Sequence, residues 1–288
     1  MTDRRAATLS ALLVVAGTAL FGTVGTARVL GPAIPSPSIA AARLGASALL
    51  LAAIALLAGR WPAMRRAWRH PWVLLAGAGQ AGFQVCFLAA VEDIGVATGT
   101  LVAIGCTPIV AGLATRQVTS TWLAATAVSV FGLVLLVGGD AGGVDLWGLA
   151  EALGASVSYA TYIVATRHLV ASGVAGLGVL AAIFVVSGTA LAPLLVLTDP
   201  GALWTRAGLA TALYLAVVPT VLAYWLFNAG LHGVSASTAA TLGLTEPVVA
   251  AVLGVLVVGE RLGPTGVAGA ALVLAGLTLL VTRQRAEQ

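Results

Sequence analysis

An ordered series of apolar segment, proline, polar break and glycine occurs twice in this chain. Residues 95–137 contain Thr107-Pro108 and end on the letters GLVLLV, and residues 234–281 contain Glu246-Pro247 and end on GLTLLV. An Ala-, Leu-, Val- and Gly-rich composition explains the GL-x-LLV match by chance more easily than it explains the shared order. An odd number of apolar segments separates each residue from its counterpart. A duplicated unit with an odd number of membrane crossings lies upside down relative to its twin, so the pattern predicts an inverted repeat.

Charged residues are too rare to cover a surface that faces water. They make up 8% of the 288 residues, whereas a soluble domain carries about 25%. We therefore expect an all-α integral membrane protein of ten transmembrane helices, built as two inverted five-helix repeats at 8–138 and 147–282. Each crossing needs roughly 17–25 apolar residues. The stretches that we assign as crossings are 8–27, 38–58, 72–91, 95–115, 121–138, 147–166, 174–196, 207–227, 234–258 and 264–282.

The basic residues, all of them arginine, gather on one side of this expected topology. Ten of the 14 fall on the face that also carries both termini. The positive-inside rule makes this face cytoplasmic, which predicts an inner-membrane protein with both termini in the cytoplasm. The net charge of +4 then needs no nucleic acid as partner. The Trp- and Arg-rich connection at 59–72 could suggest RNA contact, but it fits an anchor at the lipid headgroups better.

The chain offers no pattern for a metal, a cofactor or a nucleotide. His70, His168 and His232 lie at the edges of crossings and not in spaced pairs, and the chain has no G-x-x-x-x-G-K-[ST] motif. Cys86 and Cys106 lie within crossings and fit small packing residues better than a disulfide. We expect no cofactor and no ATP-driven motor within this chain.

Residues 236–280 carry a family resemblance. They read ASTAATLGLTEPVVAAVLGVLVVGERLGPTGVAGAALVLAGLTLL and resemble the second EamA-type unit of the drug/metabolite transporter superfamily. Phe21-Gly22, Arg43 and the SYATYIVATR segment at 158–167 also resemble features of that family. The resemblance implies ten helices in two inverted units around a polar cavity, and export or exchange of small metabolites. The first unit departs from the pattern, because ATRQVTST at 114–121 replaces the Gly-Glu break.

Glu246 and the following Pro247 lie near the middle of an expected crossing. A charged carboxylate there costs about 2.5–3.5 kcal/mol on insertion scales, so its presence suggests a function. Pro247 removes one backbone donor and loosens the helix. A carboxyl group beside such a defect is a candidate for coupling proton movement to opening of a cavity. The alternative is a structural role, in which the carboxyl group hydrogen-bonds to a neighbouring helix.

Several polar side chains fall at corresponding places in the two repeats. Gln80 and Gln84 share one face of their helix, and their counterparts are Thr220 and Tyr224. We expect the substrate-binding residues to come from this group, namely Gln80, Gln84, Tyr159, Tyr162, Tyr224 and Asn228. Hydrogen bonding between helices, worth about 0.6–2 kcal/mol per pair, explains each residue taken singly.

Arg43 lies about five residues inside the second crossing. Glu92, Asp93 and Glu151 lie at a similar depth, so Arg43 could pair with one of them as an outer gate, with Glu92 and Glu151 as the candidates for that gate, or could form a site for an anionic substrate. Alternatively its side chain extends to the headgroups. The sequence leaves the partner open.

These observations favour a secondary active transporter that exports or exchanges small metabolites, such as amino acids or their analogues, by alternating access and with protons as a candidate coupling ion. An integral membrane enzyme acting on lipids is the alternative, but the outward acidic residues are scattered over several loops. A scaffold or receptor is a third reading, which would leave a polar cavity without purpose. The expected partners are a small molecule and the bilayer, and the oligomeric state stays open.

Overall fold

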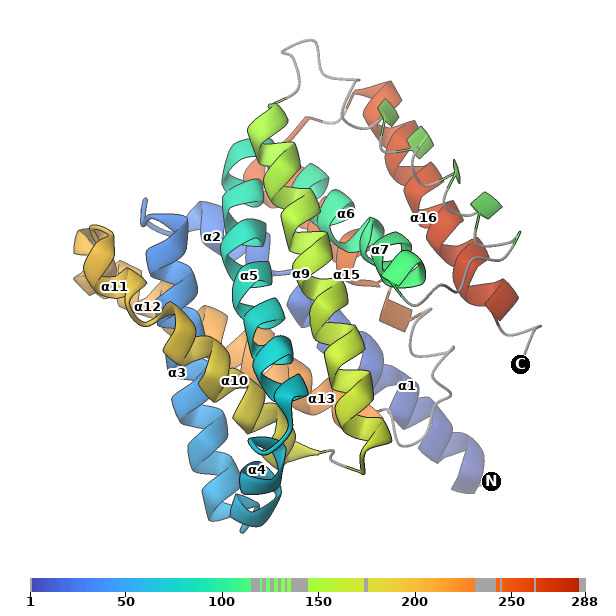
Figure 1. Cartoon of the computed structure of the whole chain (residues 1–288). Coiled ribbons are helices and arrows are strands. Elements are labelled where there is room, and N and C mark those ends of the chain that lie inside the picture. The colour runs from blue at the N-terminus through green and yellow to red at the C-terminus, as the bar shows by residue number, and fades with distance from the viewer. Residues whose placement is uncertain are drawn as a thin grey trace.

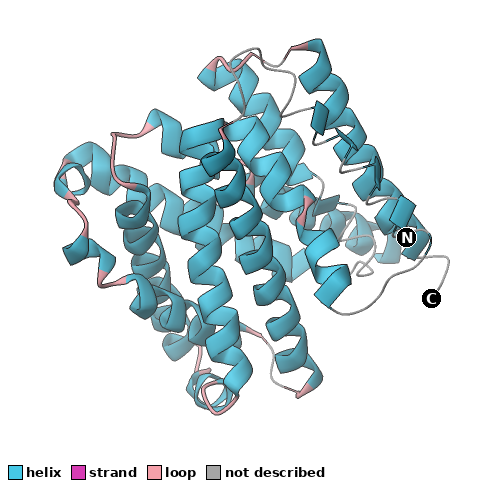
Figure 2. Ribbon diagram, turned by 45° about the horizontal axis from the view of Figure 1, so that its top comes forward, coloured by secondary structure: helices cyan, strands magenta, loops and turns pink. Residues whose placement is uncertain are grey.

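The computed structural model describes residues 2–114, 120, 123–124, 127–128, 131–132, 134–135, 145–173, 176–230, 242–243, 245–261 and 263–284. Every regular element among these residues is a helix, as Figure 2 shows. The expectation of an all-α protein is confirmed for this part of the chain.

Figure 1 shows the helices as one bundle, with α5 and α9 crossing its centre. The first 114 residues form α1 (Thr2–Phe21), α2 (Val24–Leu30), α3 (Ser36–Leu57), α4 (Trp61–Ala67), α5 (Pro71–Ile94), α6 (Val96–Gly105) and α7 (Thr107–Ala114). The later residues form α9 (Leu146–Ala171), α10 (Leu177–Leu191), α11 (Leu194–Leu197), η1 (Gly201–Trp204), α12 (Arg206–Ala216), η2 (Val217–Leu222), α13 (Ala223–Gly230), α15 (Thr245–Leu253), η3 (Gly254–Val258) and α16 (Pro264–Gln284).

Five helical stretches are long and apolar enough to cross a membrane, which fits a multi-pass membrane protein. They are Thr8–Leu30, Ser36–Leu57, Pro71–Ile94, Leu177–Leu197 and Arg206–Phe227. The expected crossing at 147–166 lies within the 26-residue helix α9. Most of the expected crossing at 121–138, and the first part of 234–258, lie outside the described residues. Ten crossings and an inverted repeat therefore stay predictions.

Prolines interrupt two of the expected continuous crossings. The stretch 95–115 breaks at Cys106 between α6 and α7, two residues before Pro108. The stretch 207–227 contains the π-helical segment η2 around Pro219. A proline inside a helix lacks the N–H donor and clashes with the carbonyl one turn earlier, so the backbone bends or widens there.

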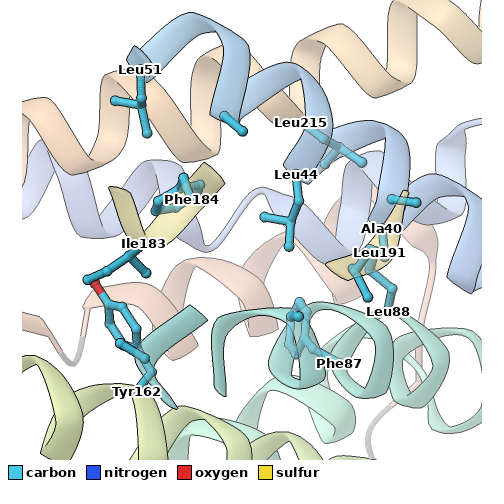
Figure 3. Packing of buried hydrophobic residues seen from close by; sticks show 14 of the residues in the cluster. Ala40, Leu44, Leu51, Phe87, Leu88, Tyr162, Ile183, Phe184, Leu191 and Leu215 are labelled. Atoms are coloured by element: carbon cyan, nitrogen blue, oxygen red, sulfur yellow. The ribbon is translucent and has the colours of Figure 1, made fainter. Parts of the chain in front are cut away.

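Many of the largest buried side chains come from α3, α5, α9 and α10. Figure 3 shows Phe184 of α10 close to Leu44 and Leu51 of α3, with Leu88 of α5 on the opposite side of the layer. These apolar side chains pack α3, α5, α9 and α10 against one another, and α3, α5 and α9 also carry polar residues described below.

Glycine allows α5 and α9 to pack backbone against backbone. A Cβ atom added at Gly79 would lie 2.7 Å from the carbonyl oxygen of Ser158 and 2.7 Å from the backbone nitrogen of Tyr162. The hydrophobic effect does not drive helices together in lipid, so close packing at small residues contributes to their association instead. Gly79 is therefore a packing requirement of the bundle centre.

Glu260 joins the end of η3 to the start of α6. Its carboxylate accepts hydrogen bonds from the backbone N–H of Val96 and, at 3.0 Å, from that of Ala97. These donors have no partner inside their own helix, so the carboxylate caps α6 from a distant segment. Gly95, with a φ of 82°, leaves room for this contact, because a Cβ atom there would lie 2.9 Å from a Glu260 carboxylate oxygen.

Gly79→Ala should destabilise the protein, because its methyl group meets backbone atoms that cannot rotate away. Overpacking of this kind costs about 1–3 kcal/mol. The matched control is Gly45→Ala, since a Cβ atom at Gly45 has no heavy atom within 4 Å. Thermal unfolding of the detergent-purified protein measures both. Equal midpoints for the two variants would contradict the close packing of α5 and α9.

Glu260→Ala should also lower the unfolding temperature, since it removes both hydrogen bonds that cap α6. Hydrogen bonds to a charged group contribute roughly 1.5–3 kcal/mol each. Glu260→Gln keeps one oxygen acceptor and should lie between wild type and Glu260→Ala. Hydrogen exchange at Val96 and Ala97 should quicken in the alanine variant, and unchanged exchange would exclude the cap.

Candidate functional site

A small cavity lies where helices from both sides of residue 145 meet. It is bounded by α1, α2, α3, α5, α9, η2, α13 and α15, and its volume is about 30 Å³. A buried water needs roughly 10–15 Å³ on this measure, so the cavity has room for about two waters. The lining residues are Phe21, Val24, Arg43, Phe83, Gln84, Phe87, Tyr159, Pro219, Tyr224 and Glu246.

Arg43 brings a guanidinium group into this cavity from α3. The residue is only 3% exposed. Its Nη1 donates to Oε1 of Gln84 at 2.5 Å, its Nε to Oγ1 of Thr220 at 3.0 Å, and its Nη2 to the carbonyl oxygen of Pro219 at 3.4 Å. A buried charge needs such polar partners in place of water. The side chain therefore joins α3 to α5 and η2.

The π-helical segment η2 supplies two of these acceptors because of its proline. Pro219 has no N–H, so the carbonyl oxygen of Leu215 lacks its usual donor one turn later. The hydroxyl group of Thr220 donates to that oxygen at 2.8 Å, which turns the hydroxyl oxygen toward Arg43. Local unwinding around a proline thus creates a polar surface inside an apolar helix.

Glu246 contributes a carboxyl group to the lining of the same cavity. It lies in α15, is partly exposed, and lines the cavity together with Arg43. Its backbone packs closely on the end of α1, where a Cβ atom at Gly22 would lie 2.7 Å from the Glu246 carbonyl oxygen. The small residue at position 22 therefore brings α1 against α15 at the depth of the carboxyl group.

Aromatic rings form the rest of the wall. Phe21 and Tyr224 pack edge to face with centroids 4.9 Å apart, and Phe83 lies 4.9 Å from Tyr159 and 5.3 Å from Phe87. Ring faces attract cations and apolar groups alike. The site thus combines one cation, one acid, an amide and several rings.

The structure brings to the cavity three of the predicted binding residues and Glu246, which was predicted to couple protons or to serve a structural role. Gln84, Tyr159, Tyr224 and Glu246 all line it, and Pro247 is buried beside Glu246 in α15. Their predicted roles in binding and proton coupling stay predictions.

Other predicted binding residues lie elsewhere. Gln80 is buried, does not line the cavity, and has no hydrogen-bond partner for either amide atom among the described residues. Tyr162 stacks on Tyr159 with centroids 5.9 Å apart and faces the apolar core near Ile183 (Figure 3). The side chain of Asn228 lies outside the described part of the structure.

Arg43 does not form the expected pair with Glu92 or Glu151. Glu92 instead accepts hydrogen bonds from Arg28 at 2.7 Å and from the hydroxyl group of Ser36 at 2.6 Å. The reason is helix rotation, because Arg43 lies on the face of α3 that meets α5 and η2. Glu151 lies in α9 close to Asp93. The expected pairing of Arg43 in an outer gate is therefore wrong, and Arg43 lines the cavity instead.

Sequence reasoning missed Arg28 and the cavity residues Phe21, Phe83 and Pro219 as parts of this region. Arg28 had a signal, because it is one of four arginines on the less basic face, three residues from Gly31. The aromatic residues had none, since a phenylalanine in an apolar helix faces lipid, core or cavity with the same sequence pattern. Among the described residues, no three His, Cys, Asp or Glu side chains lie together as metal ligands would.

Known proteins resemble this chain over nearly its whole length. The uncharacterized transporter YwfM of Bacillus subtilis (strain 168) is 34% identical over 286 residues, which cover 96% of this chain and 95% of that protein. The threonine/homoserine exporter RhtA of Escherichia coli (strain K12) is 30% identical over 286 residues, covering 95% and 92%.

The fold and the family model agree with these relatives. A solved crystal structure matches 97% of this chain and 98% of its own chain with a TM-score of 0.67, and its 20% identity speaks for the fold alone. The model of the EamA-like transporter family matches residues 146–282. With relatives of such identity and coverage, the chain belongs to the EamA-like transporter family of the drug/metabolite transporter superfamily.

Proposed function

We propose that this membrane transporter is a secondary active exporter or exchanger of small metabolites, and that it works by alternating access. Two inverted five-helix units, 8–138 and 147–282, would rock around the cavity that holds Arg43 and Glu246. The single observation that carries this proposal is the polar, oppositely charged cavity at the meeting point of helices from the two units. A substrate site between repeats is the position that such a mechanism requires.

The pairing of helices supports two related units. The contact between α5 and α9, the third and sixth expected crossings, has its counterpart in the contact between α13 and α1, the eighth and first. The contacts of α3 with α10 and of α6 with α15 each join two corresponding crossings. Contacts that come in matched sets are expected of a twofold-related pair of repeats, and the odd number of crossings in each repeat favours inversion.

The relative's name suggests the first compounds to test. RhtA exports threonine and homoserine by its name, and the cavity offers polar groups that suit a small amino acid or an analogue. A lipid-modifying enzyme is the weaker reading, because the family and its named relatives are transporters. We infer cytoplasmic termini from the arginine distribution, and accessibility of tags at both ends tests that part separately.

Proteoliposomes that contain only this protein should exchange external labelled L-threonine or L-homoserine for the same compound trapped inside. We expect saturable uptake, because a single cavity binds one substrate at a time. Arg43→Ala should abolish the uptake, since it leaves Gln84 and Thr220 without their partner and removes the cavity's cation. Protein-free liposomes give the background. Absence of exchange for these and other small metabolites would contradict the proposed function.

Glu246→Gln should make uptake independent of an imposed pH gradient, because the amide cannot bind and release a proton. Wild-type protein should respond to the gradient if Glu246 couples proton movement to transport. The matched control is Asp199→Asn, whose carboxyl group accepts a hydrogen bond from Gly201 in a connecting segment away from the cavity. Normal uptake with an unchanged pH response in Glu246→Gln would assign Glu246 the structural role instead.

A further inference from the structure

We propose that the cavity recognises a zwitterion, with Arg43 binding the carboxylate and Glu246 binding the ammonium group of a small α-amino acid. This inference rests on the proposed transport function and assigns its substrate class. The central observation is that a guanidinium group and a carboxyl group line one cavity.

The two charges face the cavity without forming an ion pair with each other. Among the described residues, the N–O contact of an ion pair joins Arg28 to Glu92 and no other pair. Attraction between opposite charges rises steeply where water is excluded, so their separation needs a structural cause. Arg43 is held back by its three hydrogen bonds toward α5 and η2, and Glu246 is held by the packing of its backbone on Gly22.

Arg43 retains donors for a ligand. A guanidinium group has five N–H donors, and three of them reach Gln84, Thr220 and the Pro219 carbonyl oxygen. One N–H then remains on each of the two terminal nitrogens. Two N–H donors of one guanidinium group can bind the two oxygens of a carboxylate. The spare donors of Arg43 therefore fit a carboxylate better than a single hydroxyl group.

Among the described residues, no cation makes an ion-pair contact with Glu246, although Arg43 lines the same cavity. In the described part of the chain, no hydrogen bond or ion-pair contact to its carboxyl group is found, and the residue lines the cavity. The rings of Phe21, Phe83 and Tyr159 line the same space, and ring faces stabilise an ammonium group. An acid beside aromatic rings is thus a suitable seat for the amino end of the ligand.

The size of the cavity favours a small ligand whose two charges lie close together. With about 30 Å³ it holds roughly two waters, so even a small amino acid must widen it on binding. Within an α-amino acid, the carboxylate and ammonium groups are attached to one carbon. Such a head group can reach both charges at once, whereas bulky side chains would meet the surrounding rings.

The test measures how wild-type protein in proteoliposomes distinguishes three labelled probes, namely L-threonine, its methyl ester and N-acetyl-L-threonine. The ester lacks the carboxylate charge and the acetyl compound lacks the ammonium charge. Loss of a charged hydrogen bond weakens binding by roughly tenfold to a hundredfold, so both derivatives should be transported with a correspondingly lower kcat/KM.

Substitutions assign each charge to one end of the ligand. The Arg43→Gln variant should transport L-threonine and its methyl ester with similar kcat/KM, and should still transport the acetyl compound with a lower kcat/KM. The Glu246→Gln variant should transport L-threonine and N-acetyl-L-threonine with similar kcat/KM, and should still transport the methyl ester with a lower kcat/KM. Asp199→Asn serves as the control and should match wild type. Unfolding midpoints show whether each variant folds, and the wild-type preference among probes remains decisive if a variant does not.

The possible results separate this inference from the transport function. Equal transport of all three probes by wild-type protein would overturn the zwitterion site and leave the transporter intact. Preference of wild-type protein for a derivative over L-threonine would do the same. Exchange of none of the probes, nor of any other metabolite, would overturn both proposals. Loss of the ester preference in Glu246→Gln rather than in Arg43→Gln would refute the assignment of the ends.

Discussion

A buried guanidinium group sets the conditions for the rest of this structure. A charge inside a membrane-spanning bundle is stable only where the protein replaces the water that it loses. Arg43 meets this demand through an amide of α5, a hydroxyl of η2 and a backbone carbonyl of η2. Three helices must therefore keep one relative position, and the apolar layer around Phe184 in Figure 3 holds them there. The polar cavity is a consequence of this arrangement.

Prolines leave backbone polar groups without their usual hydrogen bonds inside helices, so these groups can bind other partners. Pro219 unwinds η2 and frees a carbonyl oxygen for Thr220, and its own carbonyl oxygen accepts from Arg43. Pro247 lies beside the acid at the cavity in α15. A regular helix satisfies its backbone internally and offers nothing to a ligand, so a transporter in lipid needs such interruptions where it binds substrate.

Sequence reasoning could find the polar residues but not the way the helices rotate. Gln84, Tyr224 and Glu246 could be predicted because a polar group in an apolar crossing needs a reason. Gln80 shares a helix face with Gln84, yet the cavity ends before it, because helical spacing sets the direction of a side chain and not the depth of a cavity. The aromatic wall was out of reach, since apolar helices carry phenylalanine on every face.

Arg43 illustrates the same limit for pairing. Its position inside a crossing predicted a functional charge, but its hydrogen-bond partners are residues 41 or more positions away in the chain. Glu92 was a reasonable partner by depth alone. In the structure Glu92 forms its ion pair with Arg28, which the arginine distribution places on the same face of the membrane. Arg43 instead lines the cavity and donates a hydrogen bond to Gln84.

Contacts beyond the cavity join several helices at one end of the bundle. Glu92 lies about two helical turns beyond Gln84 along α5, which at about 1.5 Å per residue is a rise of roughly 12 Å from that cavity residue. There Arg28 pairs with Glu92, and a few residues later Glu260 caps α6 through Val96 and Ala97. Both contacts join segments from different parts of the chain at one end of the bundle. The helices α2, α6 and η3 contact one another there, so separating them would break the ion pair and the helix cap together. The arginine distribution predicts that this end faces outward, so the proposed export mechanism would require these contacts to break.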